Sequence, residues 1–153
     1  MNEIDNEMAL FKKELGLIKL AANSKKAIVE KLQSFFLDLE QGYGFTAKKE
    51  RITLPGKFFF IDLVFYNRIL KSFVLVNYRN GKLNEEDLEK MQLAIDYYNN
   101  EKRLETDNKT IGITIGKEDD DMSIEYILDE NFAKKDSIVL PNEEQLKQLF
   151  GGN

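Results

Sequence analysis

Asp62 has the clearest potential for chemistry in this sequence, because it is the lone carboxylate in an otherwise apolar run, residues 58–66. A buried carboxylate without a partner is costly, so it normally pairs with a cation, accepts hydrogen bonds or binds a metal ion. A second apolar run, residues 72–76, is followed by the polar tripeptide Asn77-Tyr78-Arg79. We expect the two runs to form neighbouring strands, with Asp62 beside that tripeptide.

An acid on one strand and a (D/E)-x-K tripeptide on the next is the layout of a metal-dependent nuclease. Here Asn77 and Arg79 stand where that tripeptide has its acid and its lysine. Asn77 offers an amide oxygen but no negative charge, which weakens the site for Mg²⁺. Arg79 stays protonated at any working pH, so it cannot act as a base, but it can bind a phosphate through two N–H groups. The pattern therefore indicates a nuclease-like site with altered chemistry.

The composition limits the chemistry further. The sequence has no cysteine and no histidine, which excludes thiolate chemistry, Ser-His catalysis and metal sites built on these residues. Catalysis would have to rest on carboxylates, lysine, tyrosine, hydroxyl groups or an oxygen-bound metal such as Mg²⁺, Mn²⁺ or Ca²⁺. The net charge of −5 argues against unspecific nucleic-acid binding over the whole surface, although a local basic patch is compatible with it.

The length of 153 residues suits one domain. We assign residues 24–153 to it and residues 1–23 to an N-terminal helical extension. The extension carries an apolar seam, which either packs on the domain's own core or forms a homodimer; its members are Ile4, Met8, Phe11, Leu15 and Ile18. No apolar stretch is long enough to cross a bilayer, and the acidic N-terminus lacks a signal-peptide core, so we expect a cytoplasmic protein without membrane contact.

Apolar spacing and capping residues predict the elements. Ser24 or Asn23 can cap the second helix, and Asn142 with Gln145 forms a capping box for the last one. Residues 118–121 are an acidic surface turn, and residues 122–128 form a helix or a strand. The expected helices span residues 4–18, 24–40, 84–99 and 142–150, and the expected strands span residues 45–53, 58–66, 72–78, 110–115 and 137–140. This order gives an α/β mixed sheet, with an antiparallel meander plus a buried parallel strand and helices on its faces.

Three stretches of the sequence resemble motifs of a known family. Residues 39–45 (LEQGYGF) are similar to its Glu-Leu-Gly-x-Gly-Phe, and residues 59–66 (FFIDLVFY) to its Phe-Tyr-Ile-Asp-Leu-Leu-Phe-Tyr. Residues 76–81 (VNYRNG) stand where it has Ile-Glu-Leu-Lys-x-Gly. The family is the YhcG-type nuclease domain of the PD-(D/E)XK superfamily, and the resemblance runs from about Leu32 to the C-terminus. It implies a restriction-endonuclease-like fold.

The resemblance also implies roles for individual residues. Asp62 matches the strand acid and Glu40 the helix glutamate, which in such nucleases hold Mg²⁺ or Mn²⁺; the metal activates water and stabilises charge on the phosphate. Asn77 falls on the second acidic position and Arg79 on the lysine position. Lys90 falls where the family tends to have glutamine, adding positive charge near the cleft.

Three functions remain open at this point. The first is a degenerate, catalytically impaired nuclease domain that binds nucleic acid, DNA rather than RNA, or a protein partner. The second is an active Mg²⁺- or Mn²⁺-dependent DNase in which Glu40 or Glu50 compensates for Asn77. The third is an oligomeric scaffold without a role in nucleic-acid binding.

Two local interpretations also stay open. Asp62 could be a structural acid, paired with Arg79 or capped by backbone amides. The basic residues near the site form either a nucleic-acid contact or a solvated face; they are Lys48, Lys49 and Arg51 on the first strand and Arg68 and Lys71 in the link after the second.

Overall fold

A computed structural model of the chain describes residues 24–132 and 134–150. The expected helix 4–18 and the seam within residues 1–23 lie outside the described residues. Within those residues, no helix is both long enough and apolar enough to cross a membrane.

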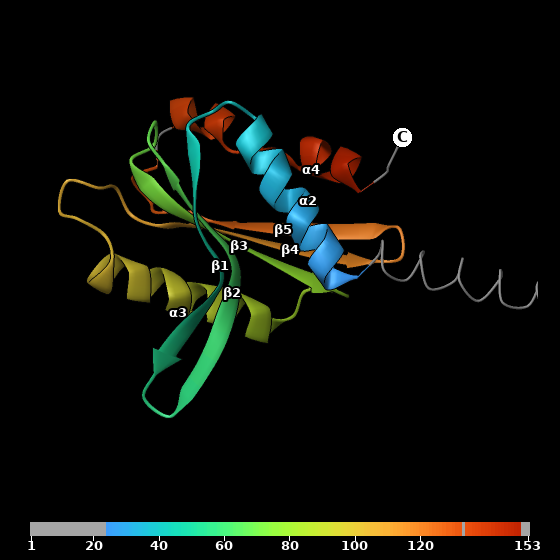
Figure 1. Cartoon of the computed structure of the whole chain (residues 1–153), viewed down its shortest axis with the longest axis horizontal. Coiled ribbons are helices and arrows are strands. Elements are labelled where there is room, and N and C mark those ends of the chain that lie inside the picture. Colours follow the sequence, from blue (N-terminus) through green and yellow to red (C-terminus); the bar gives the residue numbers. More distant parts are fainter. Residues whose placement is uncertain (1–23, 133, 151–153) are drawn as a thin grey trace, which may run out of the picture.

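A five-stranded mixed sheet forms the centre of the domain, with its strands in the order β1-β2-β3-β4-β5 (Figure 1). The first three strands form an antiparallel meander, β3 and β4 are parallel, and β4 and β5 form an antiparallel hairpin. This confirms the expected α/β architecture. The strands span Tyr43–Leu54, Lys57–Asn67, Ser72–Asn80, Ile111–Glu118 and Asp121–Ile127.

Helices cover both faces of the sheet. Helix α2 (Lys25–Asp38), α4 (Glu143–Leu149) and the 3₁₀ helix η1 (Lys134–Val139) lie on one face, and α3 (Glu85–Glu101) lies on the other (Figure 1). Two apolar clusters follow from this layering. The first contains Phe36, Phe65 and Leu146, and the second joins Ile52, Ile61 and Met91 beneath α3. The crossover from β3 through α3 to β4 brings the end of β3 close to the start of α3.

Both expected caps are confirmed. The Ser24 hydroxyl accepts a hydrogen bond from the Ala27 N–H at the start of α2. At the start of α4, Asn142 and Gln145 form the reciprocal bonds of a capping box. The ambiguous segment 122–128 lies largely in strand β5, and residues 118–121 make the turn of the β4–β5 hairpin.

The prediction of a strand at residues 137–140 is wrong, because most of this segment lies in the 3₁₀ helix η1. Pro141 follows at once and has no N–H to donate to a sheet ladder. The carbonyl of Val139 accepts a hydrogen bond from the Tyr43 hydroxyl, and that of Pro141 from Tyr126. The segment therefore closes the α2 side of the core through tyrosine contacts.

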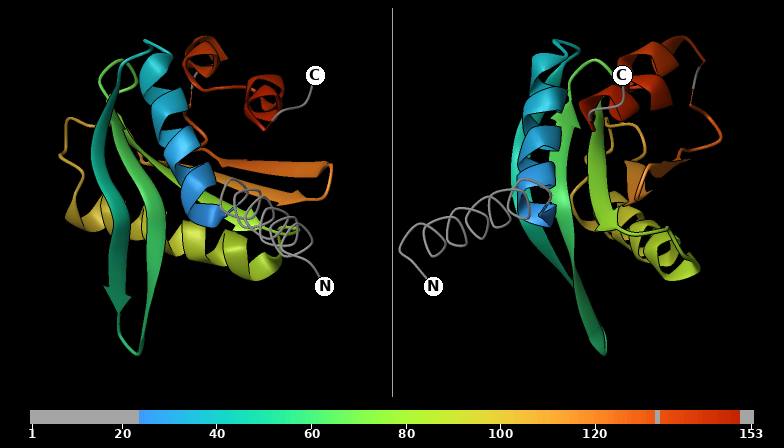
Figure 2. Two further views of the ribbon diagram at one scale, coloured as in Figure 1. Left: turned by 45° about the vertical axis from the view of Figure 1, so that its right-hand side comes forward. Right: turned by 90° about the vertical axis from the view of Figure 1, so that its right-hand side faces the viewer.

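The β1–β2 hairpin is longer than its contact with the rest of the sheet. Strand β2 pairs with β1 along almost its whole length, but with β3 only from Leu63↔Val76 to Asn67↔Ser72. Beyond that point the hairpin continues alone, and its turn projects past α3 (Figures 1 and 2). We call residues 49–61, the part of the hairpin beyond β3, the arm. The place where β2 parts from β3 is the place where Asp62 and Asn77 lie.

Candidate functional site

Asp62 and Asn77 hold the two strands together where regular pairing ends. Oδ2 of Asp62 accepts a hydrogen bond from the Tyr78 N–H at 2.8 Å, and Oδ1 of Asn77 accepts one from the Asp62 N–H at 2.8 Å. Each side chain thus satisfies a backbone donor of the opposite strand, in place of a carbonyl of the ladder. The predicted proximity of Asp62 to the tripeptide is confirmed, and its carboxylate accepts one backbone amide of that tripeptide.

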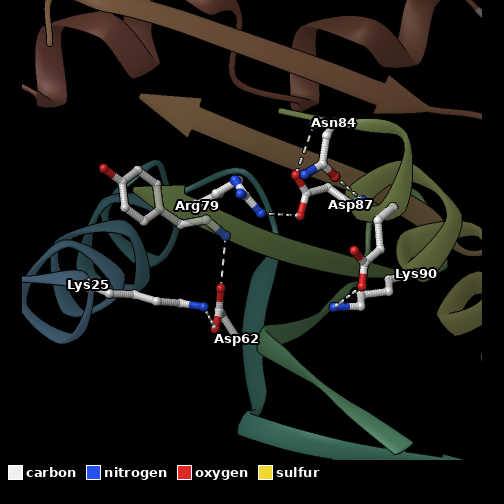
Figure 3. A network of polar contacts seen from close by, with 8 residues as sticks. Lys25, Asp62, Arg79, Asn84, Asp87 and Lys90 are labelled. Carbon is white, nitrogen blue, oxygen red and sulfur yellow. Dashed lines mark hydrogen bonds and ion pairs between the residues drawn. The ribbon is translucent and has the colours of Figure 1, made fainter. Parts of the chain in front are cut away.

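The cation that pairs with Asp62 is Lys25 rather than Arg79. Nζ of Lys25 lies 3.2 Å from Oδ1 of Asp62 (Figure 3). Lys25 is the first residue of α2, where the helix dipole disfavours a positive charge. A residue that breaks a local rule in this way is a common sign of a functional position. A lysine in the first turn of a helix was the signal in the sequence that could have identified Lys25, and it was not recognised.

Arg79 is engaged by helix α3 on the other side of the site. Its Nη1 lies 3.3 Å from Oδ1 of Asp87, while Oδ2 of Asp87 accepts the Asn84 N–H in the capping box of α3 (Figure 3). One turn further on, Lys90 pairs with Glu86 at 3.2 Å. Asp87 therefore has two roles, as part of the cap of α3 and as the partner of Arg79.

These side chains surround a cavity of about 190 Å³. Its lining contains three cationic and two carboxylate side chains among the described residues; the full set is Lys25, Asp62, Asn77, Tyr78, Arg79, Asp87, Lys90 and Thr114. The Thr114 hydroxyl is buried and has no hydrogen-bond partner within the described chain. A buried hydroxyl in a polar cavity can donate to a bound oxygen atom. Burial raises the pKa of Tyr78, so its phenol carries its proton at neutral pH and cannot serve as a base.

The residues of the cavity do not fit a hard divalent cation. Mg²⁺ and Mn²⁺ require several oxygen ligands, preferably carboxylates, at short distance. Asp62 is already bound to an ammonium group and a backbone N–H, and the oxygen of Asn77 is bound to another N–H. Across residues 24–132 and 134–150, no three acidic side chains gather closely enough to hold a metal ion. The site has the geometry of an ion-paired pocket.

The two carboxylates considered as compensating ligands lie elsewhere. Glu40 follows the far end of α2, about 20 Å along the helix from Lys25 at 1.5 Å per residue. It therefore does not join Asp62, which corrects the expected position of the helix glutamate. Glu50 pairs across the hairpin with Ile61. Burial raises the pKa of Tyr98 on α3, and the negative charge of Glu50 raises it further. Glu50 thus faces the packed side of α3.

The basic residues named from the sequence divide into separate groups. Lys90 and Arg79 line the pocket. Lys48 pairs with Glu30 of α2 at 3.6 Å, whereas Lys49 and Arg51 lie over aromatic rings of the arm. The turn that carries Arg68 and Lys71 joins β2 to β3 at the opposite end of β2 from the arm, so these two do not extend the same surface.

Replacing Asp62 with alanine should destabilise the fold. The change leaves the Tyr78 N–H without its acceptor and removes the partner of Lys25, and a largely buried unsatisfied group costs about 1–3 kcal/mol. Urea unfolding should show this loss in the free energy of unfolding. Asp120→Ala, in the exposed β4–β5 turn, is the control and should change it by less than about 0.5 kcal/mol. Equal stability of wild type and Asp62→Ala would contradict the structural role of the carboxylate.

A family model described as the YhcG PDDEXK nuclease domain matches residues 15–146. The Escherichia coli (strain K12) protein named "Putative nuclease YhcG" is 25% identical over 126 residues, which cover 80% of this chain and 34% of that protein. The chain therefore spans about a third of the length of this relative.

Proposed function

Because the chain belongs to the YhcG PDDEXK nuclease domain family, we propose that its pocket binds the phosphate backbone of a nucleic acid without a metal ion and without cleaving it. DNA is the expected nucleic acid. The observation that carries this proposal is the charge of the pocket: Lys25, Arg79 and Lys90 line it, and both of its carboxylates are occupied by cations. The resemblance of residues 76–81 places Asn77 and Arg79 at the family's acidic and lysine positions.

The pocket offers the donors that a phosphate needs. Arg79 presents a planar fork of N–H groups, which matches two phosphate oxygens. Lys25 adds a point charge from α2, and the unpartnered Thr114 hydroxyl can donate from the floor of the cavity. These groups come from a helix, a strand end and the neighbouring parallel strand, so their spacing is set by the fold rather than by a loop.

The ion pairs inside the pocket do not prevent binding. The Lys25 and Arg79 side chains are about half exposed, whereas the carboxylates that they pair with are largely buried. Asp87 binds Nη1 of Arg79, so a phosphate can bind other N–H groups of the same guanidinium while this ion pair stays in place. Asp87 also accepts the Asn84 N–H, which keeps the start of α3 in place.

Cleavage has little support from the same residues. Burial raises the pKa of Tyr78, so its phenol cannot deprotonate a water molecule at neutral pH, and a guanidinium such as that of Arg79 does not serve as a base. The second carboxylate that would complete a metal site is replaced by Asn77, whose oxygen is bound to backbone. We therefore propose a domain that keeps the phosphate contact of its family and lacks the hydrolytic step.

The proposal is tested by fluorescence anisotropy of the full chain with labelled DNA and RNA, each in EDTA and in Mg²⁺. We expect the same affinity in both. If the pocket and its surroundings contact about three phosphates, affinity should fall roughly 20- to 40-fold between 50 and 200 mM salt. Lys102→Ala, at the far end of α3, serves as the control and should leave the salt dependence unchanged. Binding that requires Mg²⁺ and disappears in EDTA would overturn the proposal.

A further inference from the structure

The arm exposes two phenylalanines on one of its faces. Phe58 is 55% and Phe60 42% exposed, and their rings meet edge to face with centroids 6.1 Å apart. The intervening Phe59 and the following Ile61 point the other way and are buried in the cluster under α3. The buried row accounts for the folding of the arm, so the exposed row is not required by the core.

Cations accompany the two exposed rings. The guanidinium of Arg51 lies 4.0 Å from the centroid of Phe58, and Nζ of Lys49 lies 5.8 Å from that of Phe60. The arm contains three basic residues and one acid, Glu50, which faces α3; the basic residues are Lys49, Arg51 and Lys57. In a chain of net charge −5, the arm is thus a local concentration of positive charge.

The strand that carries the two rings runs on to the pocket, which Asp62 lines. Phe58 and Phe60 share a face of β2 because they alternate along the strand. Asp62 follows where this alternation breaks, since Ile61 packs in the cluster under α3 and Leu63 in the cluster on the opposite face. At about 3.3 Å per residue, Phe58 lies roughly 13 Å from Asp62 along the strand. A chain of nucleotides that follows the arm would therefore pass from the exposed rings to the cationic pocket.

We propose that the arm stacks unpaired nucleobases on Phe58 and Phe60, so that the nucleic acid bound at the pocket is single-stranded along the arm. This inference rests on the proposed function. Aromatic rings beside cations bind single strands because every base has a stacking face and every linkage a negative charge. A duplex hides the faces of its bases, so it could use the cations of the arm but not the rings. Charge favours this ligand over an apolar protein partner.

The test uses the full chain with three labelled ligands: a thymidine oligomer, a matched abasic oligomer with the same phosphates, and a duplex. We expect Phe58→Leu with Phe60→Leu to lower affinity for the thymidine oligomer at least tenfold, since stacking on each ring is lost. Affinity for the abasic oligomer should not change. Phe45→Leu is the matched control, because Phe45 is also 42% exposed and lies at the other end of the hairpin, and it should have no effect. A uridine oligomer extends the test to RNA.

A second readout uses the absence of tryptophan from the sequence. The indole introduced by Phe58→Trp should be quenched when the thymidine oligomer binds, whereas that introduced by Phe45→Trp should not. This measurement reports stacking at one position without removing an aromatic ring. Equal quenching at both positions, or none at position 58, would overturn the inference.

The outcomes separate this inference from the proposed function. Salt-dependent binding that requires Arg79 but not Phe58 and Phe60 would contradict base stacking on the arm and support phosphate binding at the pocket. Binding that depends on the two rings but not on Arg79 would support the arm and overturn the pocket. A change in oligomeric state of the double variant, with unchanged affinity for the oligomer, would overturn the inference in favour of a second copy of the chain.

Discussion

Replacing Arg79 with alanine should weaken nucleic-acid binding by roughly 10- to 150-fold, which corresponds to the loss of about 1.5–3 kcal/mol for charge-assisted hydrogen bonds. The change removes the only guanidinium that lines the pocket among the described residues and leaves Asp87 as an unpaired negative charge beside the phosphate. Anisotropy in EDTA measures the effect, and the salt slope should fall by about one.

Removing the charge of Asp87 should change the affinity for nucleic acid in the opposite direction. Asp87→Asn keeps an amide oxygen that can accept the Asn84 N–H, but it removes the carboxylate that competes with phosphate for Arg79. We therefore expect binding to become stronger in Asp87→Asn and weaker in Arg79→Ala. Equal affinity of wild type and Arg79→Ala, or a loss no larger than that of Lys102→Ala, would show that phosphate is bound elsewhere.

Replacing Asn77 and Arg79 with the glutamate and lysine that the resemblance places at these positions should create a metal site. In Asn77→Glu with Arg79→Lys, a second carboxylate joins Asp62 at the point where β2 and β3 part. A hard cation gains a full charge and up to two ligand atoms, so we expect Mn²⁺ affinity to rise at least tenfold above that of the wild type. Isothermal titration calorimetry measures this directly.

The matched control for this change is Asn77→Gln with Arg79→Lys. Glutamine has the size and shape of glutamate without its charge, so this variant should bind Mn²⁺ no better than the wild type. If both double variants bind Mn²⁺ equally, the charge at position 77 is not what distinguishes this pocket from a metal site.

The sequence could predict the strands that carry the site because their patterns are strong and local. The apolar run around Asp62, the run that ends at Asn77 and the capping residue Asn142 each specify an element by themselves. The segment at residues 137–140 was harder, because a short apolar stretch fits a strand or a turn of 3₁₀ helix equally well. Its conformation depends on hydroxyl groups of Tyr43 and Tyr126, which are distant in the sequence.

The partners within the pocket could not be deduced in the same way. Lys25 reaches Asp62 only because α2 crosses the sheet with its first turn above the parting of β2 and β3. Glu40 was expected beside Asp62, yet it follows the end of α2 that is opposite to Lys25. Thr114 shows no local signal at all, since its role depends on lying beside Asn77 in the parallel pair of β3 and β4.

The measurement that tests the central claim most directly is a cleavage assay of the wild-type chain on supercoiled plasmid and single-stranded DNA with Mn²⁺, beside Asp62→Ala. We expect both proteins to leave the DNA intact under conditions where anisotropy shows the wild type bound. Nicking or degradation by the wild type that Asp62→Ala abolishes would contradict a metal-independent binding pocket, and would mean that the ion pairs of Asp62 and Arg79 open to admit a metal ion.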